Sequence, residues 1–345
     1  MKSSKTVFLG MSGGVDSSVS ALLLKEQGYQ VVGVYMKNWS KDLPGMKCPW
    51  AEDLADAKRV AVKLGIDFRV FDFETDYKQK VVDYMLAEFQ KGRTPNPDIM
   101  CNQEIKFKLF YETARAEGAD LIATGHYAQT DNQNLLRAVD ENKDQTYFLY
   151  RINQEAIAHT LFPIGHLKKP EVKALAAKHQ LANAYKKESM GVCFVGEVGI
   201  KDFLKTYLPI QPGEIREAET NTLLGMHDGA IFYTIGQRHG LNLGGGLPFY
   251  VVRKDIRQNI VYVSKNLNHS QLWTNELVLE DIIIRNDSSQ SPLNLKVRLR
   301  HRAALLPAKL LEQKLIFQSP IKRPAAGQSA VFYQGDICLG GGIIH

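Results

Sequence analysis

Apolar and polar positions follow two different patterns along the chain, and the change between them comes near residue 200. Before it, short apolar runs alternate with longer stretches whose apolar residues recur at helical spacing. The predicted strands are 6–10, 31–36, 67–73 and 120–124. One predicted helix follows the first strand and ends near residue 27, and two others cover 51–64 and 77–90. Such alternation predicts an α/β domain with a parallel sheet and helices on both faces. Ligands of such sheets bind at the carboxyl ends of the strands.

After residue 200 the helical spacing fades, and short β-rich runs separated by Gly, Asn and Pro replace it. These runs are 230–234, 250–253, 260–263, 277–284, 295–299 and 330–333. Their spacing is typical of small β domains, and we expect the last one to be a barrel. We therefore divide the chain into an α/β domain over 1–199, a central β-rich domain over 200–269 and a C-terminal β-barrel over 270–345.

The composition is that of a globular protein, with 345 residues of which 44% are hydrophobic and 23% charged. A single core stops growing near about 250–300 residues, so two or three domains agree with the length. No apolar run is long enough to cross a membrane, and the short one after Met1 is expected to be the first strand, not a signal peptide. Four cysteines are too few for a disulfide framework and lack zinc-site spacing. We expect a cytoplasmic protein without a metal site or a permanently bound cofactor.

Positive charge is concentrated at the C-terminal end. The net charge is +6, and the last 65 residues alone carry nine basic against four acidic side chains. Lys296, Arg298, Arg300 and Arg302 occupy every second position, so a continuous strand would present all four on one face. Such a row can follow a phosphate backbone, although a solvated basic face explains the same charges.

A glycine-rich loop, Gly10–Ser18 (GMSGGVDSS), separates the first strand from the first helix. Adjacent glycines let the backbone curl with its N–H groups pointing inward, and the helix adds its positive end. Ser12, Ser17 and Ser18 supply hydroxyl donors, and Asp16 is suited to hold Mg²⁺ near a phosphate. The loop lacks the Gly-Lys-Ser/Thr of a Walker A loop and does not match GxGxxG. We predict a phosphate cradle of another kind.

Cys101 follows a stiff segment, TPNPDIMCN, in which two prolines exclude a helix before Ile99. If a helix begins at Ile99, Asp98 caps it and its dipole lowers the pKa of the Cys101 thiol. The local residues fit a buried, inert cysteine equally well. Cys193 lies in KKESMGVCFVG, where glycines allow movement and Lys186 and Lys187 would favour a thiolate. A core cysteine on a Val-Cys-Phe-Val strand is the competing interpretation.

The order of several motifs along the chain decides between a reactive and an inert interpretation of the two cysteines. SGGVDSS resembles the PP-loop of ATP pyrophosphatases, which cleave ATP between the α and β phosphates and transfer AMP to a substrate oxygen. SGGVDSS, TPNPDIMCN, ATGHY, NKDQTYFLY, KKESMGVCF and the C-terminal PAAGQSAVFYQGDICLGGG occur in this order in the bacterial tRNA-specific 2-thiouridylases, the MnmA family. The resemblance runs essentially from end to end. The chain departs from the family by Lys-Glu-Ser-Met-Gly-Val before Cys193, where Lys-Asp-Ser-Thr-Gly-Ile is usual.

The resemblance implies an enzyme that activates the wobble uridine of a tRNA with ATP and Mg²⁺ and then replaces its C2 oxygen with sulfur. It implies Cys101 as nucleophile, Cys193 as persulfide carrier forming a transient disulfide, and Asp98 as acid/base group. Asn96, Pro97 and Asp98 would line the pocket of the target base. The implied ATP-binding residues are Gly10, Met11, Ser12, Gly13, Gly14, Val15, Asp16, Ser17, Met36 and Gly125. The implied tRNA contacts are His126, Lys143, Asp144, Gln145, Arg300, His301 and Gln328.

The implied partners are an upstream persulfide relay protein and the tRNAs for lysine, glutamate and glutamine. Two other functions compete with this one. A PP-loop ligase for a small metabolite would use the ATP loop but leave both cysteines and the basic end without a role. An RNA-binding protein without activity would leave the intact SGGVDSS loop unexplained.

Overall fold

The computed structural model describes residues 5–42, 48–186, 199–244, 247–285 and 292–345. The chain forms two compact units. The first unit consists of Met1–Val82, Pro97–Gly199 and Tyr333–Gly340, and the second of Asp83–Asn96, Ile200–Phe332 and Gly341–His345. Within the described ranges, no helix is both long enough and apolar enough to span a bilayer.

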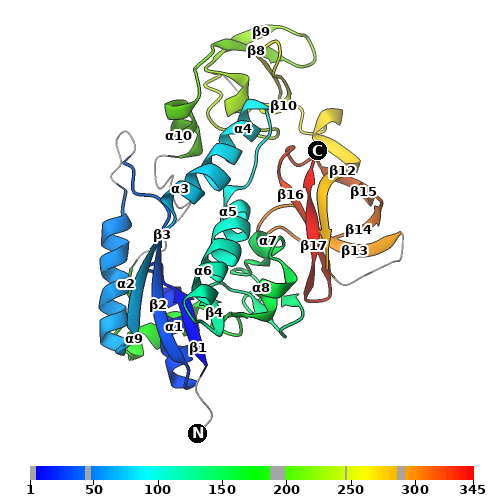
Figure 1. The fold of residues 1–345 in the computed structure, drawn as a ribbon. Helices are drawn as coiled ribbons and strands as arrows, with labels where there is room; N and C mark the ends of the chain where they lie inside the picture. The colour runs from blue at the N-terminus through cyan, green and yellow to red at the C-terminus, as the bar shows by residue number, and fades with distance from the viewer. Residues whose placement is uncertain (1–4, 43–47, 187–198, 245–246, 286–291) are drawn as a thin grey trace. The chain divides into compact units, whose positions relative to one another are not determined.

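A five-stranded parallel sheet in the order β3-β2-β1-β4-β7 forms the centre of the first unit (Figure 1). Alternate residues of β1 serve opposite faces, with Leu9 on one face and Phe8 near Phe71 on the other. Both faces are therefore buried, which explains the continuous apolar run. The predicted parallel sheet is confirmed. Its strands are β1 (Thr6–Gly10), β2 (Gln30–Lys37), β3 (Asp67–Asp72), β4 (Leu121–Thr124) and β7 (Thr160–Leu161).

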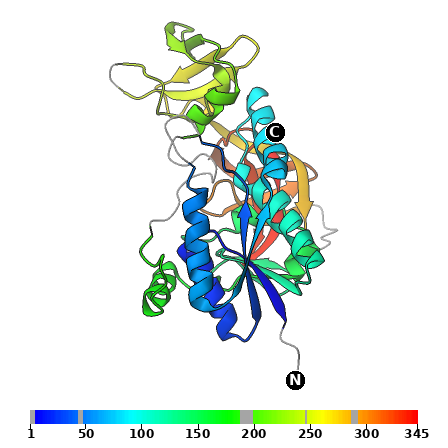
Figure 2. The same ribbon diagram turned by 60° about the vertical axis from the view of Figure 1, so that its left-hand side comes forward.

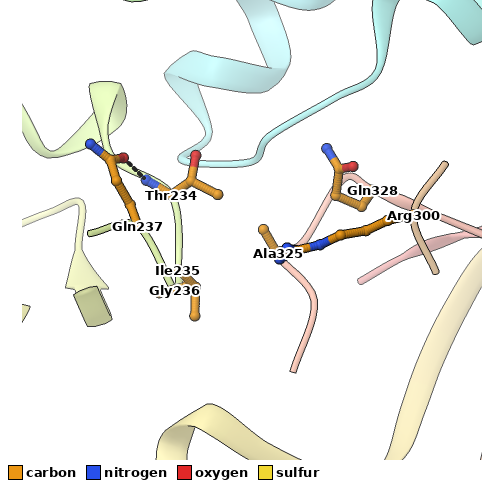
Figure 3. Close-up of a pocket in the computed structure, with 7 residues that line it drawn as sticks. All are labelled: Thr234, Ile235, Gly236, Gln237, Arg300, Ala325 and Gln328. Atoms are coloured by element: carbon orange, nitrogen blue, oxygen red, sulfur yellow. Dashed lines mark hydrogen bonds between the residues drawn. The ribbon is translucent and has the colours of Figure 1, made fainter. Parts of the chain in front are cut away.

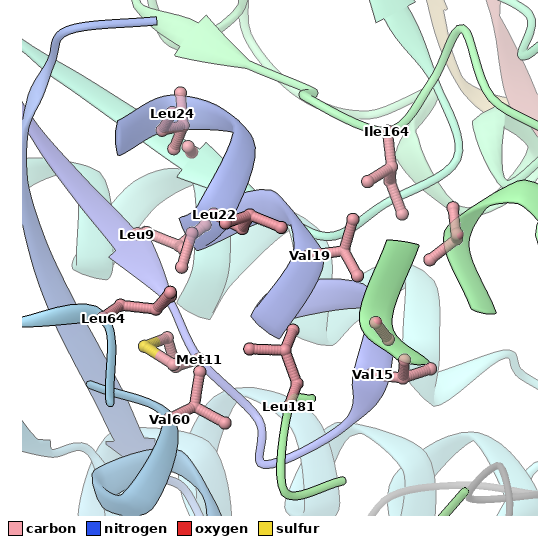
Figure 4. Close-up of a cluster of buried hydrophobic side chains, with 14 of the residues drawn as sticks. Leu9, Met11, Val15, Val19, Leu22, Leu24, Val60, Leu64, Ile164 and Leu181 are labelled. Carbon is pink, nitrogen blue, oxygen red and sulfur yellow. The ribbon is translucent and has the colours of Figure 1, made fainter. Parts of the chain in front are cut away.

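Helices cover both faces of this sheet. On the Leu9 face lie α1 (Val15–Glu26), α2 (Trp50–Leu64) and α9 (Lys169–Lys178). On the other face α6 (Phe110–Ala116) contributes Phe110, whose ring centroid lies 6.3 Å from that of Phe71. The core on the Leu9 face, drawn in Figure 4, includes Leu9, Met11, Val15, Val19, Leu22, Leu24, Val60, Leu64, Ile164 and Leu181.

Two long helical stretches of the chain are interrupted by π-helical turns. The helix predicted over 77–90 begins earlier and consists of α3 (Glu74–Tyr77), the π-helix η1 (Lys78–Asp83) and α4 (Tyr84–Gln90). The second stretch runs from α5 (Pro97–Met100) through the π-helix η2 (Cys101–Leu109) into α6. π-helical turns are rare in proteins, and those that occur are often found at functional sites. The shorter elements of the first unit are β5 (Gln129–Thr130), β6 (Leu135–Leu136), α7 (Thr146–Leu149) and α8 (Gln154–Ala158).

The second unit contains a small sheet in the order β10-β11-β8-β9, drawn in yellow-green tones in Figure 2. Its strands are β8 (Gly213–Glu217), β9 (Leu223–His227), β10 (Tyr250–Asp255) and β11 (Ile260–Ser264), and α10 (Ile200–Tyr207) precedes them. The sequence did not predict β8 and β9, which lack a long apolar run. The strand predicted over 230–234 is wrong, because Ala230–Phe232 form the 3₁₀-helix η3. Such a short apolar run is compatible with any buried element.

The C-terminal strands close into a six-stranded barrel, as predicted. Their order is β12-β15-β14-β13-β16-β17, and β12 also pairs with β17. Closure removes free sheet edges. The strands are β12 (Trp273–Ile284), β13 (Leu293–Arg298), β14 (Leu306–Leu311), β15 (Lys314–Lys322), β16 (Ser329–Gln334) and β17 (Ile337–Ile344), and the 3₁₀-helix η4 (Ser270–Leu272) leads into the first of them.

Candidate functional site

The glycine-rich loop has the geometry of an anion cradle. Gly13 has a φ of +75°, and a Cβ at this position would collide with the carbonyl oxygen of Asp53. Only glycine meets both conditions. α1 begins at Val15, and its N-cap residue Gly14 provides no side-chain cap. The first N–H groups of this helix therefore remain available to an anion.

The loop serines have different roles. The hydroxyls of Ser17 and Ser18 donate to the carbonyl oxygen of Gly14 at 3.1 and 3.0 Å. Both side chains are buried and donate to the backbone, so a hydroxyl contact of Ser17 or Ser18 with a phosphate would require these bonds to break. Ser12 is exposed, and its N–H donates to Ser17 Oγ at 3.2 Å. Of these three hydroxyls, that of Ser12 lies at the surface.

Asp16 is held by two partners that sequence reasoning missed. Lys169 Nζ donates to Asp16 Oδ1 and Oδ2 at 2.7 and 2.8 Å, and the Tyr127 hydroxyl donates to Oδ1 at 2.9 Å. The Lys169 side chain is buried, with the residue 6% exposed. Lys169 lies 153 residues beyond Asp16 in the sequence, so no local pattern could have paired them. Tyr127 belongs to the ATGHY motif, which was the available signal.

The strand ends predicted to border adenosine do lie beside the loop. A Cβ on Gly10 would lie 2.8 Å from Met36 Cε at the end of β2. A Cβ on Gly125, just after β4, would lie 2.7 Å from the backbone N of Ser17. The loop, Met36 and Gly125 thus form one cluster at the carboxyl ends of three parallel strands, which is where such sheets bind ligands.

Cys101 lies further into its helix than predicted. The helix begins at Pro97, a residue suited to the first helical position, and Asp98 lies within its first turn instead of capping it. Cys101 opens the π-helix η2, beyond the first turn, where the dipole effect is weaker. The Cys101 side chain is buried, at 3% exposure, and Cys101 forms no disulfide with another described cysteine.

Lys106 acts electrostatically on both Asp98 and His126. Burial raises the pKa of the Asp98 carboxyl, and the positive charge of Lys106 offsets part of this rise. Burial, and secondly the charge of Lys106, hold the pKa of His126 well below its usual value. Lys106, which the sequence analysis missed, lies about one π-helical turn beyond Cys101. A carboxyl with a raised pKa is suited to proton transfer near neutral pH.

His126 is part of a packed aromatic group. Its Nδ1 lies 2.7 Å from the Thr124 hydroxyl, and its ring centroid lies 5.7 Å from that of Phe107 and 6.5 Å from that of Phe162. The lowered pKa keeps this ring neutral at physiological pH. A contact of His126 with tRNA would therefore be a neutral hydrogen bond or a stacking contact.

The Lys143-Asp144-Gln145 turn packs against the ATGHY segment. Gln145 Oε1 accepts from the Tyr127 N–H at 2.8 Å. Asp144 is 0% exposed and accepts from the Thr146 hydroxyl at 2.9 Å. Its carboxylate therefore shapes the turn from inside the protein, and its predicted tRNA contact stays a prediction. The predicted contacts of Lys143 and Gln145 stay predictions.

Cys193 lies outside the described residues, so its role stays a prediction. The segment before it contains Asn183, another residue that the sequence analysis missed, which is 2% exposed and bonds to the glycine-rich loop. Lys186 pairs with Asp53 and Asp56 at 2.7 and 2.6 Å. Although burial opposes it, these bonds raise the pKa of Lys186. Its positive charge is thus paired with two carboxylates instead of stabilising a Cys193 thiolate.

Two of the predicted tRNA contacts in the second unit line one cavity of about 290 Å³. Arg300 and Gln328 form one wall, and the Thr234–Gln237 turn forms the other (Figure 3). Gln328 Nε2 donates to the carbonyl oxygen of Thr94 at 2.5 Å. This bond connects the cavity wall to the 83–96 segment of the same unit. The last residue of that segment, Asn96, is one of the residues predicted to line the base pocket. His301, the next residue after Arg300, is half-buried.

The predicted row of four cations is wrong. β13 ends at Arg298, which is buried, and a bend and a turn follow it. Arg302 lies in this turn with a φ of +63°. Lys296, Arg300 and Arg302 are exposed, but the strand geometry that would align them with Arg298 ends before Arg300. Within the described ranges, no group of three His, Cys, Asp or Glu is arranged to hold a metal ion.

Three family profiles match the chain in succession. Residues 5–197 match the tRNA methyl transferase HUP domain, 201–265 the tRNA methyl transferase PRC-barrel domain, and 274–344 the aminomethyltransferase beta-barrel domain. The first match alone covers more than half of the chain. The α/β sheet, the small central sheet and the closed barrel fall in these three ranges.

The curated proteins named below match this chain over nearly its full length, and each is described as a tRNA-specific 2-thiouridylase MnmA. The protein from Pseudomonas fluorescens (strain Pf0-1) is 49% identical, over 99% of this chain and 95% of the relative. The protein from Stutzerimonas stutzeri (strain A1501) is 48% identical, over 98% and 94%. The protein from Listeria monocytogenes serotype 4a (strain HCC23) is 47% identical, over 98% and 94%.

Proposed function

Because the chain belongs to the MnmA family of tRNA-specific 2-thiouridylases, we propose that it uses ATP to replace the C2 oxygen of a tRNA wobble uridine with sulfur. The observation that carries this proposal is the uncapped α1 N-terminus behind Gly13, clustered with Met36 and Gly125. This cluster supports an ATP phosphate site. The matched profiles mention methyl transfer, which needs no such phosphate cradle and no cysteine pair.

The glycine-rich loop would bind the phosphates of ATP. The free N–H groups at the start of α1 and the exposed Ser12 hydroxyl are suitable donors. Asp16 Oδ2 accepts from Lys169 Nζ and retains further lone pairs, so it fits as a single carboxylate ligand of Mg²⁺. Mg²⁺ bound with ATP would neutralise phosphate charge. Lys169 and Tyr127 would hold the Asp16 carboxylate in place.

The uridine oxygen must be activated, because it is a poor leaving group. The C2 oxygen attacks the α-phosphorus of ATP, and pyrophosphate departs. Asp98 accepts the N3 proton of the base in this step, and its raised pKa supports this role. The C2–O bond can then break with AMP as the leaving group. A base that reacts in this way must leave its stack, which suits an anticodon loop.

Sulfur transfer then uses both cysteines. The terminal sulfur of a Cys193 persulfide bonds to C2 as AMP leaves. Cys101 Sγ next bonds to Cys193 Sγ, the original sulfur–sulfur bond breaks, and its electron pair stays on the uridine sulfur. A Cys101–Cys193 disulfide remains, and an external thiol reductant must reopen it. Because Cys101 is buried, this step requires local rearrangement of its surroundings.

The substrates and partners follow from the same family. We propose the tRNAs for lysine, glutamate and glutamine as substrates, a persulfide relay protein as sulfur donor, and the reducing cytoplasm as compartment. Arg300 supports the RNA assignment. It is exposed on a cavity wall, and no carboxylate of the described ranges pairs with it. Such a cation is suited to a phosphate of the RNA chain.

Replacing either cysteine tests this function. Cys101→Ser and Cys193→Ser should each reduce 2-thiouridine formation by roughly a thousandfold or more, because serine cannot carry or accept the sulfur. ATP binding should be retained. Mass spectrometry of digested tRNA measures the thiolated base, and equilibrium dialysis measures bound ATP.

Cys48→Ser is the matched control, since Cys48 is a buried free cysteine outside the proposed chemistry. It should leave thiolation within about twofold of the parent chain. Normal thiolation by either Cys101→Ser or Cys193→Ser would exclude the two-cysteine route. Absence of 2-thiouridine with the parent chain, ATP, sulfur donor and tRNA all present would exclude the function itself.

A further inference from the structure

Asn183 joins the segment after α9 to the glycine-rich loop. Its Nδ2 donates to the carbonyl oxygen of Gly13 at 2.8 Å and to Ser18 Oγ at 2.8 Å. The side chain is almost fully buried. These are bonds from a neutral amide to the loop that we assign to ATP phosphates, and no sequence motif pointed to them.

The bond to Gly13 fixes the direction of one peptide group. The Gly13 carbonyl and the Gly14 N–H belong to the same planar trans peptide, so they point in opposite directions. Asn183 holds the carbonyl, and the Gly14 N–H is thereby turned away from Asn183. Gly13 has a φ of +75°, a region where glycine has no strong preference of its own. The Gly14 N–H itself donates only a long bond, 3.4 Å, to the exposed Ser12 hydroxyl, whereas the bond from Asn183 to the other end of the same peptide is 2.8 Å.

The second bond belongs to a chain of hydrogen bonds in which each donor direction is determined. The Ser18 hydroxyl donates to the Gly14 carbonyl at 3.0 Å, so Ser18 Oγ accepts from Asn183. Exchanging the oxygen and nitrogen of the Asn183 amide would place two oxygens against each other at Gly13. The amide orientation is therefore fixed, and both loop carbonyls, Gly13 and Gly14, are held by side-chain donors.

The segment that contains Asn183 is also anchored to α2. Three residues later, Lys186 pairs with Asp53 and Asp56 on α2. Asp53 also packs with its carbonyl against Gly13. The loop, the start of α2 and the 183–186 segment thus form a closed set of contacts. Asn183 Oδ1 has no partner within the described ranges, which makes this buried amide an inefficient stabiliser of the fold.

We propose that Asn183 is a positioning residue for ATP: it turns the Gly13–Gly14 peptide so that the Gly14 N–H faces the bound phosphates. This inference rests on the proposed function, because it takes the glycine-rich loop as the ATP site. Asn183 acts through the loop and does not itself touch ATP. Its effect is on the geometry of the phosphate donors, so it should change the affinity for ATP more than the fold.

Asn183→Asp tests this inference with nearly the same shape. A carboxylate cannot donate to the Gly13 carbonyl, so the Kd for ATP should rise about tenfold at pH 8. At pH 6 the buried carboxyl takes up a proton more readily and can donate again, so the ratio to the parent chain should shrink. Equilibrium dialysis of ATP on the full chain measures both ratios. In thiolation assays the KM for ATP should rise while kcat at saturating ATP stays within about twofold.

Two further variants complete the test. Asn183→Thr keeps one donor and should give an intermediate Kd. It also decides the question if Asn183→Asp does not fold: weaker ATP binding supports the proposal, and unchanged binding overturns it. Ala182→Ser, at the exposed neighbouring position, should bind ATP as the parent chain does.

The outcomes separate this inference from the proposed function. A folded Asn183→Asp chain with the parent Kd for ATP, or with a Kd ratio that does not change with pH, overturns the positioning role alone. A parent chain that binds no ATP overturns the proposed function instead. A fall in kcat without a change in KM would identify Asn183 as a merely structural residue.

Discussion

Lys106 acts electrostatically on two residues that are central to the proposed chemistry. Its charge lowers the pKa of Asp98, against a larger rise caused by burial, and it adds to the lowering of the pKa of His126. The result is a carboxyl whose pKa is raised from its ordinary value and a histidine that stays neutral. If Asp98 is the base, activation requires its ionised form, so the rate should fall as the pH falls through its raised pKa.

Lys106→Met should move this acidic limb of the pH–rate profile to higher pH. Without the lysine charge, burial acts on Asp98 unopposed and its pKa rises further. The measurement is kcat/KM for tRNA thiolation as a function of pH.

Lys108→Met is the matched control for this shift. It removes the same charge from the same π-helix, but Lys108 is exposed and pairs with Glu104 at 3.1 Å. Its acidic limb should stay in place. A limb that stays in place for Lys106→Met, or moves to lower pH, would show that Asp98 is not the base.

Among the elements, the glycine-rich loop and the sheet beside it were predictable from sequence, whereas helix starts and irregular segments were not. Adjacent glycines after an apolar strand predict a turn from local sequence alone, independently of the rest of the fold. The start at Pro97 instead of Ile99 moved Cys101 out of the first helical turn. The run at 230–234 is buried but not extended, and β13 ends at Arg298, before the predicted row of cations is complete.

Gly125→Ala tests the contact between two elements, the end of β4 and the start of α1. The added Cβ would lie 2.7 Å from Ser17 N and 3.0 Å from Ser17 Cα, both backbone atoms that cannot move aside. We expect a loss of roughly 1–3 kcal/mol in the free energy of unfolding and at least about tenfold weaker ATP binding. Urea denaturation and equilibrium dialysis measure the two effects.

Gly244→Ala is the control substitution, because nothing lies within 4 Å of its added Cβ and its φ is not in the left-handed region. It should change the free energy of unfolding by no more than about 0.5 kcal/mol. Full stability and full ATP affinity in Gly125→Ala would contradict the close packing of β4 on α1.

For the molecule as a whole, periodicity predicted the parallel sheet and the spacing of the last strands predicted the barrel. Contacts between distant residues could not be predicted. Asp16 with Lys169 and Gly13 with Asn183 lie more than 150 residues apart in the chain. No local pattern encodes such pairs, because only the complete fold brings them together. The division at 199 and 270 and the role of Cys193 stay predictions.

The central claim is that ATP activates the base itself. Following the C2 oxygen of the uridine through the reaction tests this claim most directly. An anticodon stem-loop RNA with heavy oxygen at C2 of the wobble uridine is incubated with the protein, ATP, Mg²⁺ and a persulfide donor. Mass spectrometry then examines the AMP released. The proposed mechanism predicts that AMP carries the heavy oxygen in proportion to the 2-thiouridine formed. Formation of 2-thiouridine with unlabelled AMP would contradict adenylation of the C2 oxygen.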